Sequence, residues 1–216
     1  THRTNRIVGL TKAQFSLKLD AVACHESQFP AGARDGATIR NAETGEIRTE
    51  GNYANGMLSN GDGSRAVNRG SITTIGTGSN GMNAETSADV VNFGEILTSG
   101  DEAVGMRASL GSTATNEETG EIVTLGDMSH GMEAYGIGSI ATNYGSVETR
   151  GEDSHGMKAT DGAQAVNFAG VVTTGDRSFG MYAEGAGSVD RSEQLQTNVA
   201  ALVTQTQMVL APDQAG

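Results

Sequence analysis

The side chains of this 216-residue chain that could do chemistry are acids and histidines that recur about every 25 residues. Asp101, Asp127, Glu152 and Asp176 each directly follow a glycine. Carboxylate oxygens of this kind suit Ca²⁺, but the Gly-Gly-x-Gly-x-Asp nonapeptide of calcium-binding β-rolls is absent. We therefore expect a solvated acidic stripe, in which these four residues are only weak metal candidates and no metal is bound.

Two histidines, His130 and His155, occupy equivalent positions two residues before a methionine. A stacked histidine pair could contribute to a metal site, but no cysteine or fixed third ligand accompanies the two side chains. The same column elsewhere holds Asn55, Asn80 and Val104. We expect an exposed, solvated histidine pair.

The sequence contains no Gly-x-Ser-x-Gly, His-Glu-x-x-His or phosphate-binding loop. Polysaccharide-cleaving β-helix enzymes carry paired carboxylates on one face, and the acids of this chain are scattered without aromatic sugar platforms beside them. We expect no catalytic residues, no cofactor and no enzymatic activity. A polysaccharide-degrading β-helix enzyme remains as an alternative.

The elements that position these side chains are revealed by the methionines. Six of the eight methionines are spaced by 24 to 26 residues: Met57, Met82, Met106, Met132, Met157 and Met181. Self-similarity at this period is the signature of a solenoid, in which each coil buries its apolar side by stacking on its neighbours. The sequence therefore predicts an all-β parallel β-solenoid with about six coils.

Each repeat contains three short segments with strand periodicity. One runs apolar-x-Thr-x-Gly, as in Ile122 to Gly126, and the shared face predicts that the threonine points inward with the isoleucine. A second begins at the methionine, and a third leads to an asparagine. The closing glycine indicates a corner that needs either positive φ or a close backbone approach. Three strands and three corners make a three-sided coil.

The asparagine column comprises Asn68, Asn92, Asn116, Asn143 and Asn167. Stacked amides at the strand spacing can hydrogen-bond along the stack and satisfy buried polar groups at a corner. A ligand-binding row is the functional alternative, and we favour the structural ladder. Two repeats carry extra residues directly after this column, at 42–44 and 117–119, where an insertion leaves the strands in register.

The formal net charge of −12 argues against nucleic acid and anionic membranes as partners. No stretch reaches the roughly 18 apolar residues of a membrane span, so we expect no direct membrane insertion. The single cysteine, Cys24, allows no intramolecular disulfide.

The two ends of the chain lack the repeat. We expect an N-terminal cap over residues 1–35, the solenoid over 36–190 and a helical segment over 191–216. Leu195, Val199 and Leu202 follow helical spacing that is also a heptad seam. The segment is therefore either a cap packed on the last coil or the start of a coiled-coil stalk, and the latter predicts a homotrimer.

The unit Gly-Ser-Ile-Ala-Thr-Asn-Tyr-Gly-Ser-Val-Glu-Thr-Arg-Gly-Glu-Asp-Ser-His-Gly-Met-Lys-Ala at 138–159 resembles repeats in passenger regions of bacterial autotransporter adhesins. A solenoid followed by a heptad segment is also similar to the head of trimeric autotransporter adhesins. The resemblance implies an extracellular segment on the bacterial cell surface that attaches to host cells, matrix or glycans. A phage or virus tail-fibre segment is the main alternative. We expect adhesive contacts at the outward positions and at the insertions 42–44 and 117–119.

Overall fold

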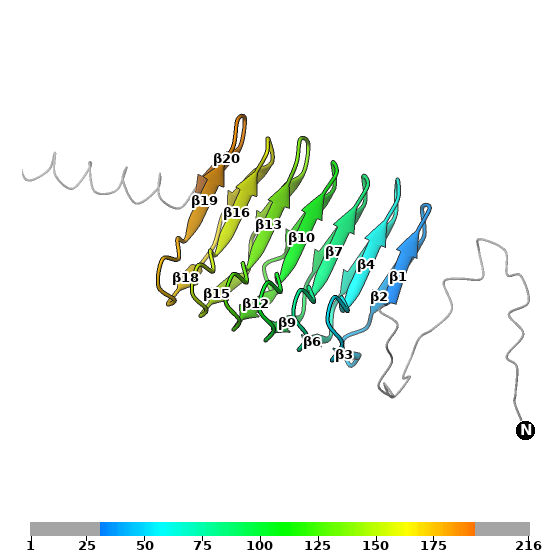
Figure 1. Cartoon of the computed structure of the whole chain (residues 1–216). Helices are drawn as coiled ribbons and strands as arrows, with labels where there is room; N and C mark the ends of the chain where they lie inside the picture. Colours follow the sequence, from blue (N-terminus) through cyan, green and yellow to red (C-terminus); the bar gives the residue numbers. More distant parts are fainter. Residues whose placement is uncertain (1–30, 193–216) are drawn as a thin grey trace, which may run out of the picture.

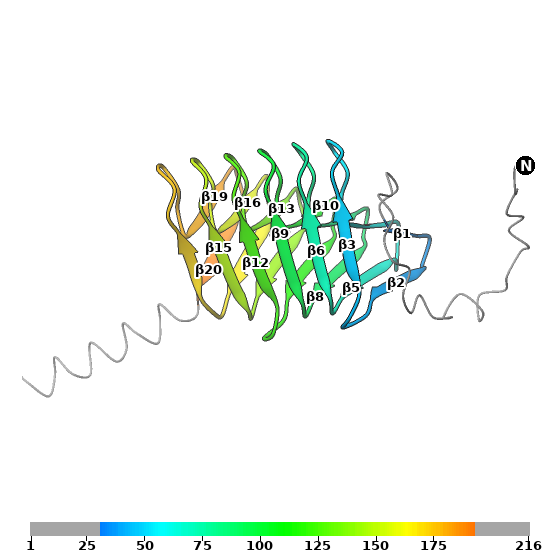
Figure 2. The ribbon, with the colours of Figure 1, turned by 90° about the horizontal axis from the view of Figure 1, so that it is seen from below.

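The computed structural model describes residues 31–192, and these residues form strands, turns and loops without a helix. Each of the first six coils contributes one strand to each of three parallel sheets, and the chain then adds one more strand to sheet A and one to sheet B (Figures 1 and 2). Sheet A contains β1 (Ala31–Arg34), β4 (Met57–Asn60), β7 (Met82–Glu85), β10 (Met106–Ser109), β13 (Met132–Tyr135), β16 (Met157–Thr160) and β19 (Met181–Glu184). Sheet B contains β2 (Thr38–Asn41), β5 (Arg65–Asn68), β8 (Asp89–Asn92), β11 (Thr113–Asn116), β14 (Ile140–Asn143), β17 (Gln164–Asn167) and β20 (Val189–Ser192). Sheet C contains β3 (Glu46–Thr49), β6 (Ser71–Thr74), β9 (Glu95–Thr98), β12 (Glu121–Thr124), β15 (Ser146–Thr149) and β18 (Val171–Thr173).

The predicted three-sided parallel β-solenoid is confirmed. Neighbouring coils pair in the register given by the repeat, so that Met106 lies between Met82 and Met132 in sheet A. The strands extend slightly beyond the predicted limits of the solenoid, because β1 begins at Ala31 and β20 ends at Ser192. The rest of the expected N-terminal cap, Cys24 and the expected helical segment lie outside the described residues.

The core is a thin column inside the three sheets. The first residues of five sheet A strands, Met57, Met82, Met106, Met132 and Met157, are at most 1% exposed. They pack with Ile72, Ile96, Ile122 and Val147 from sheet C. Met181 is only partly buried because it lies in the last described coil. Methionine suits this interior because its unbranched side chain fills irregular gaps between the small residues of sheets A and B.

The glycines that close sheet C have no positive φ, and from Gly76 onward they serve close approach to the backbone of the preceding coil. A Cβ on Gly126 would lie 2.5 Å from the carbonyl carbon of Gly100 in the preceding coil. The preceding threonine closes the same corner from inside, as predicted. Thr124 Oγ1 donates a hydrogen bond of 2.6 Å to the carbonyl oxygen of Ser129. The equivalent bond is made in four other coils, by Thr49, Thr74, Thr98 and Thr149.

The asparagine column forms the expected ladder at the corner between sheets B and C. Asn68 Nδ2 donates to Asn92 Oδ1 over 2.8 Å, and this bond recurs from Asn41 to Asn167 at 2.8–2.9 Å. The insertions at 42–44 and 117–119 form turns beside the ladder, closed by hydrogen bonds from Gly45 N and Gly120 N. Strand register on both sides is unchanged.

Candidate functional site

The corner between sheets C and A carries the side chains that the sequence marked for chemistry. Two residues after each closing glycine, the backbone takes a left-handed conformation, with φ of 57° at Tyr53, 66° at Gly78 and 53° at Met128. Non-glycine residues adopt this conformation at a cost, and the turn it produces directs the side chain outward. The result is a row of projecting side chains along the stack, which we call the corner ridge: Tyr53, Glu102, Met128, Asp153 and Arg177, interrupted at Gly78.

The acidic stripe lies beside this ridge and is exposed. Its side chains bind the next coil: Asp101 Oδ1 accepts a hydrogen bond from Asp127 N over 3.1 Å, and Asp127 Oδ1 accepts one from Glu152 N over 2.9 Å. Asp176 lies exposed in the last described coil. Within residues 31–192, no group of three or more His, Cys, Asp or Glu side chains is arranged to hold a metal ion.

The expectation of an exposed histidine pair was wrong. His130 and His155 are 7% and 8% exposed, and their rings stack at 4.9 Å with an angle of 6° between the planes. The rings lie beneath the corner ridge, where each Nδ1 accepts a backbone hydrogen bond from the next coil. His155 N donates to His130 Nδ1 over 3.1 Å, and Phe179 N donates to His155 Nδ1 over 3.2 Å.

The same position acts as an acceptor in other coils. Asn55 Oδ1 accepts from Asn80 N over 3.0 Å, and Asn80 Oδ1 accepts from Val104 N over 2.9 Å. Because a ring nitrogen that accepts a hydrogen bond carries no proton, both imidazoles are neutral with the proton on Nε2. The histidines therefore form a structural acceptor column with the asparagines.

Burial keeps these rings neutral. Desolvation chiefly lowers the pKa of His130 to about 3. The Lys158 cation acts in the same direction, as would His155 if it were protonated, whereas Asp153 opposes the shift. Burial also lowers the pKa of His155, again with Lys158, while Asp153 and Glu184 oppose the change. These shifts are the ones expected for an imidazole removed from water among mixed charges.

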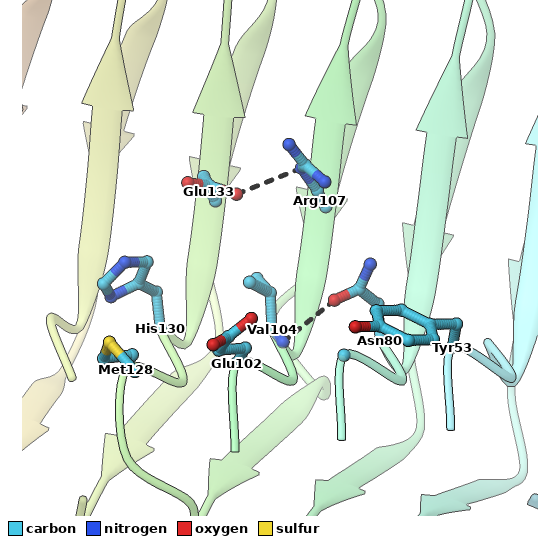
Figure 3. Close-up of a pocket in the computed structure, with 9 residues that line it drawn as sticks. Tyr53, Asn80, Glu102, Val104, Arg107, Met128, His130 and Glu133 are labelled. Carbon is cyan, nitrogen blue, oxygen red and sulfur yellow. Dashed lines mark hydrogen bonds and ion pairs between the residues drawn. The ribbon is translucent and has the colours of Figure 1, made fainter. Parts of the chain in front are cut away.

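A hollow of about 270 Å³ opens where Gly78 interrupts the ridge (Figure 3). Tyr53 and Met128 stand at its two ends, and its floor is formed by the acceptor column at Asn80, Val104 and His130. Its wall is the outer face of sheet A. There Arg107 Nε lies 3.0 Å from Glu133 Oε2 in an ion pair whose arginine side chain is 38% exposed.

Sequence reasoning missed this hollow. The sequence signal for the hollow is the glycine at position 78, where the equivalent residue in each of the other coils carries a side chain. The outward direction of these side chains depends on positive φ values, which the spacing of the repeat does not reveal.

Aromatic side chains also gather at another corner, between sheets B and C. There Tyr144 stacks on Phe168 at 4.8 Å, and the Arg69 guanidinium lies 4.3 Å from the centre of the Phe93 ring.

Within the described residues, no helix has the length and apolarity to cross a membrane. Comparison with curated proteins and with solved structures found no match. A family model, by contrast, matches residues 7–169 and again 106–190. Overlapping matches are natural for a repeat whose coils align in more than one position. These matched ranges include every coil described above, and the chain belongs to the family of the BigA third pectate lyase-like domain.

Proposed function

We propose that this chain is a non-catalytic adhesive segment of a bacterial surface protein, exposed outside the cell. BigA, for which the family is named, is a bacterial surface adhesin-like protein. The proposal extends this surface role to the chain and adds attachment to host cells, matrix or glycans.

The observation that carries the proposal is the contrast between inward and outward positions of one strand. In sheet A the inward residue at the start of strands β4 to β19 is always methionine. The next residue lies on the other face and differs in every coil: Leu58, Asn83, Arg107, Glu133, Lys158 and Tyr182. All are partly exposed except Asn83, which is 4% exposed. A constant interior that supports a varied outer surface is suited to display and recognition.

Glu148 and Asp153 are unsuited to act as general acids, because that role needs a raised pKa at neutral pH. Hydrogen bonding from Arg150 lowers the pKa of Glu148, and hydrogen bonding from Arg177 lowers the pKa of Asp153. Both carboxylates belong to surface ion pairs.

Adhesion is tested by binding the fluorescently labelled full chain to cultured cells, immobilised matrix proteins and a glycan array. We expect saturable binding to at least one of these surfaces. The control is the same chain unfolded in denaturant and diluted onto the same surfaces. Absence of binding to all three surfaces would contradict the proposal.

The words "pectate lyase-like" in the family description make polysaccharide cleavage the second candidate. A lyase would release unsaturated uronic ends, and a hydrolase would release new reducing ends. We expect neither product from incubation of the full chain with pectic and neutral polysaccharides. Turnover that is lost when one pair of acids is neutralised would replace the adhesin proposal with an enzymatic one.

We also propose a homotrimer, on the basis of the heptad seam at Leu195, Val199 and Leu202. Light scattering should give three times the chain mass for the full chain and a monomer for a chain ending at Ser192, where β20 ends. A monomer in both cases would reject the trimer.

The alternative origin, a phage tail fibre, would be indicated by tail genes next to the gene for this chain.

A further inference from the structure

We propose that the hollow beside Gly78 binds one neutral sugar residue of a larger glycan. The inference rests on the proposed adhesive function and names its site and ligand class. The hollow of about 270 Å³ is small and open on one side, which suits one sugar residue whose neighbours in the glycan remain in solvent. A drug-sized ligand needs a larger pocket.

One end of the hollow offers an exposed and pre-positioned aromatic face. Tyr53 is 75% exposed, and its ring lies so close to Gly78 that a Cβ there would be 2.6 Å from Tyr53 Cε1. Glycine at this position therefore lets the ring pack against the backbone of the next coil. The apolar C–H face of a pyranose can pack on such a ring, while the Tyr53 hydroxyl stays in contact with water.

The floor contributes buried polar groups with fixed orientation. Asn80 is 6% exposed, and its Oδ1 is held by Val104 N, which directs Nδ2 toward the hollow (Figure 3). Nδ2 has no hydrogen-bond partner among residues 31–192. Nδ2 is therefore an available donor at the floor of the hollow, where a ligand oxygen can replace water as its acceptor. His130 also lines the hollow, as a neutral imidazole whose Nδ1 is the acceptor for His155 N.

The charges of the lining select against acidic sugars. Arg107 is paired with Glu133, and Glu102 on the ridge adds a further carboxylate, so the hollow carries net negative charge. The donors on the floor and the carboxylate acceptors around it match hydroxyl groups, which both donate and accept. A uronic acid would place a carboxylate against Glu102 and Glu133, and like charges at close range are unfavourable.

The test uses the full chain with neutral oligosaccharides of glucose, galactose and mannose, and with oligogalacturonate as the acidic probe. Binding is followed by calorimetry and by the NMR signals of the histidine rings. We expect at least one neutral oligosaccharide to bind and to shift the His130 signals, with no comparable effect of oligogalacturonate. Tyr53→Ala should weaken this binding about tenfold, because the stacking surface is lost.

Tyr144→Ala is the matched control, since it removes an exposed aromatic ring at the corner between sheets B and C and should leave affinity unchanged. Tighter binding of oligogalacturonate, equal affinity of Tyr53→Ala, or no neutral sugar bound at millimolar concentration would overturn the site. If the Tyr53→Ala chain still attaches to cells as the unaltered chain does, this site is not the adhesive one and the proposed function stands. If the unaltered chain attaches to nothing, the proposed function fails as well.

Discussion

Acidification should destabilise the solenoid through its buried histidine stack, and His130→Asn should remove a defined share of that effect. Asparagine is the matched replacement because Asn80, in the same column, already accepts the backbone hydrogen bond of the next coil through Oδ1. The variant keeps an acceptor for His155 N and removes the titratable ring.

The magnitude follows from the difference in proton affinity between the folded and unfolded states. The pKa of His130 is about 3 when folded and 6.5 at its ordinary value, so the unfolded chain binds the proton first as the pH falls. The stabilising contribution of the neutral ring is therefore fully present above pH 6.5 and is lost progressively toward pH 3. Each pH unit in this window costs about 1.4 kcal/mol, or about 2 kcal/mol between neutrality and about pH 5.

The assay is urea unfolding at about pH 7.5 and about pH 5 for both chains, followed by circular dichroism. Acids distant from His130 titrate alike in both proteins, so their contributions cancel in the double difference. The difference therefore reports His130 together with its coupled neighbours His155 and Asp153. We expect the unaltered chain to lose about 2 kcal/mol more than His130→Asn on acidification. Equal losses in the two chains would show that the stack opens and admits protons at little cost, and would refute the reasoning.

Five further substitutions test the interior. Met132→Asp buries an unpaired carboxylate and should cost several kcal/mol in the free energy of unfolding, whereas Met132→Leu should cost less than about 1.5 kcal/mol. Gly105→Ala should cost about 3 kcal/mol in the same urea assay, because its Cβ would lie 2.5 Å from the carbonyl oxygen of Gly131. Asn116→Ala should cost about 3 kcal/mol in the free energy of unfolding, because it breaks the amide ladder on both sides. Asn41→Ala should cost less, because Asn41 stands at the end of the ladder and loses one ladder bond. Equal losses of stability in the two variants would contradict a continuous chain of amide bonds.

The features that could be predicted from sequence are those in which backbone periodicity alone decides direction. Alternation within a strand places Met132 and Ala134 inside, and repetition at about 25 residues places Met132 beside Met106. The inward threonine follows in the same way from its shared face with Ile122. These inferences needed no knowledge of side-chain contacts.

The direction of side chains at the corner between sheets C and A could not be predicted in this way, because a loop lacks the inward-outward alternation of a strand. His130 precedes β13 in a loop, so strand alternation does not say whether it is exposed. Its burial depends on the ridge above it, which exists because Met128 adopts a positive φ. The hollow in turn depends on one ridge position being glycine, a local substitution whose effect appears only when three neighbouring coils are assembled.

The corner columns explain why side chains of different chemistry can occupy equivalent positions. At a corner the chain leaves the regular ladder, and a backbone N–H of the next coil needs an acceptor. Directly after the closing glycine, Asn52 Oδ1 and Asp127 Oδ1 each supply one. Two residues before the methionine, Asn80 Oδ1 and His130 Nδ1 do so. The only requirement is an acceptor atom placed opposite the backbone N–H of the next coil, which an amide, a carboxylate or a neutral imidazole can each provide. Repeats can therefore differ in charge and in response to pH while preserving one backbone, and this freedom permits a recognition surface to vary along a constant solenoid.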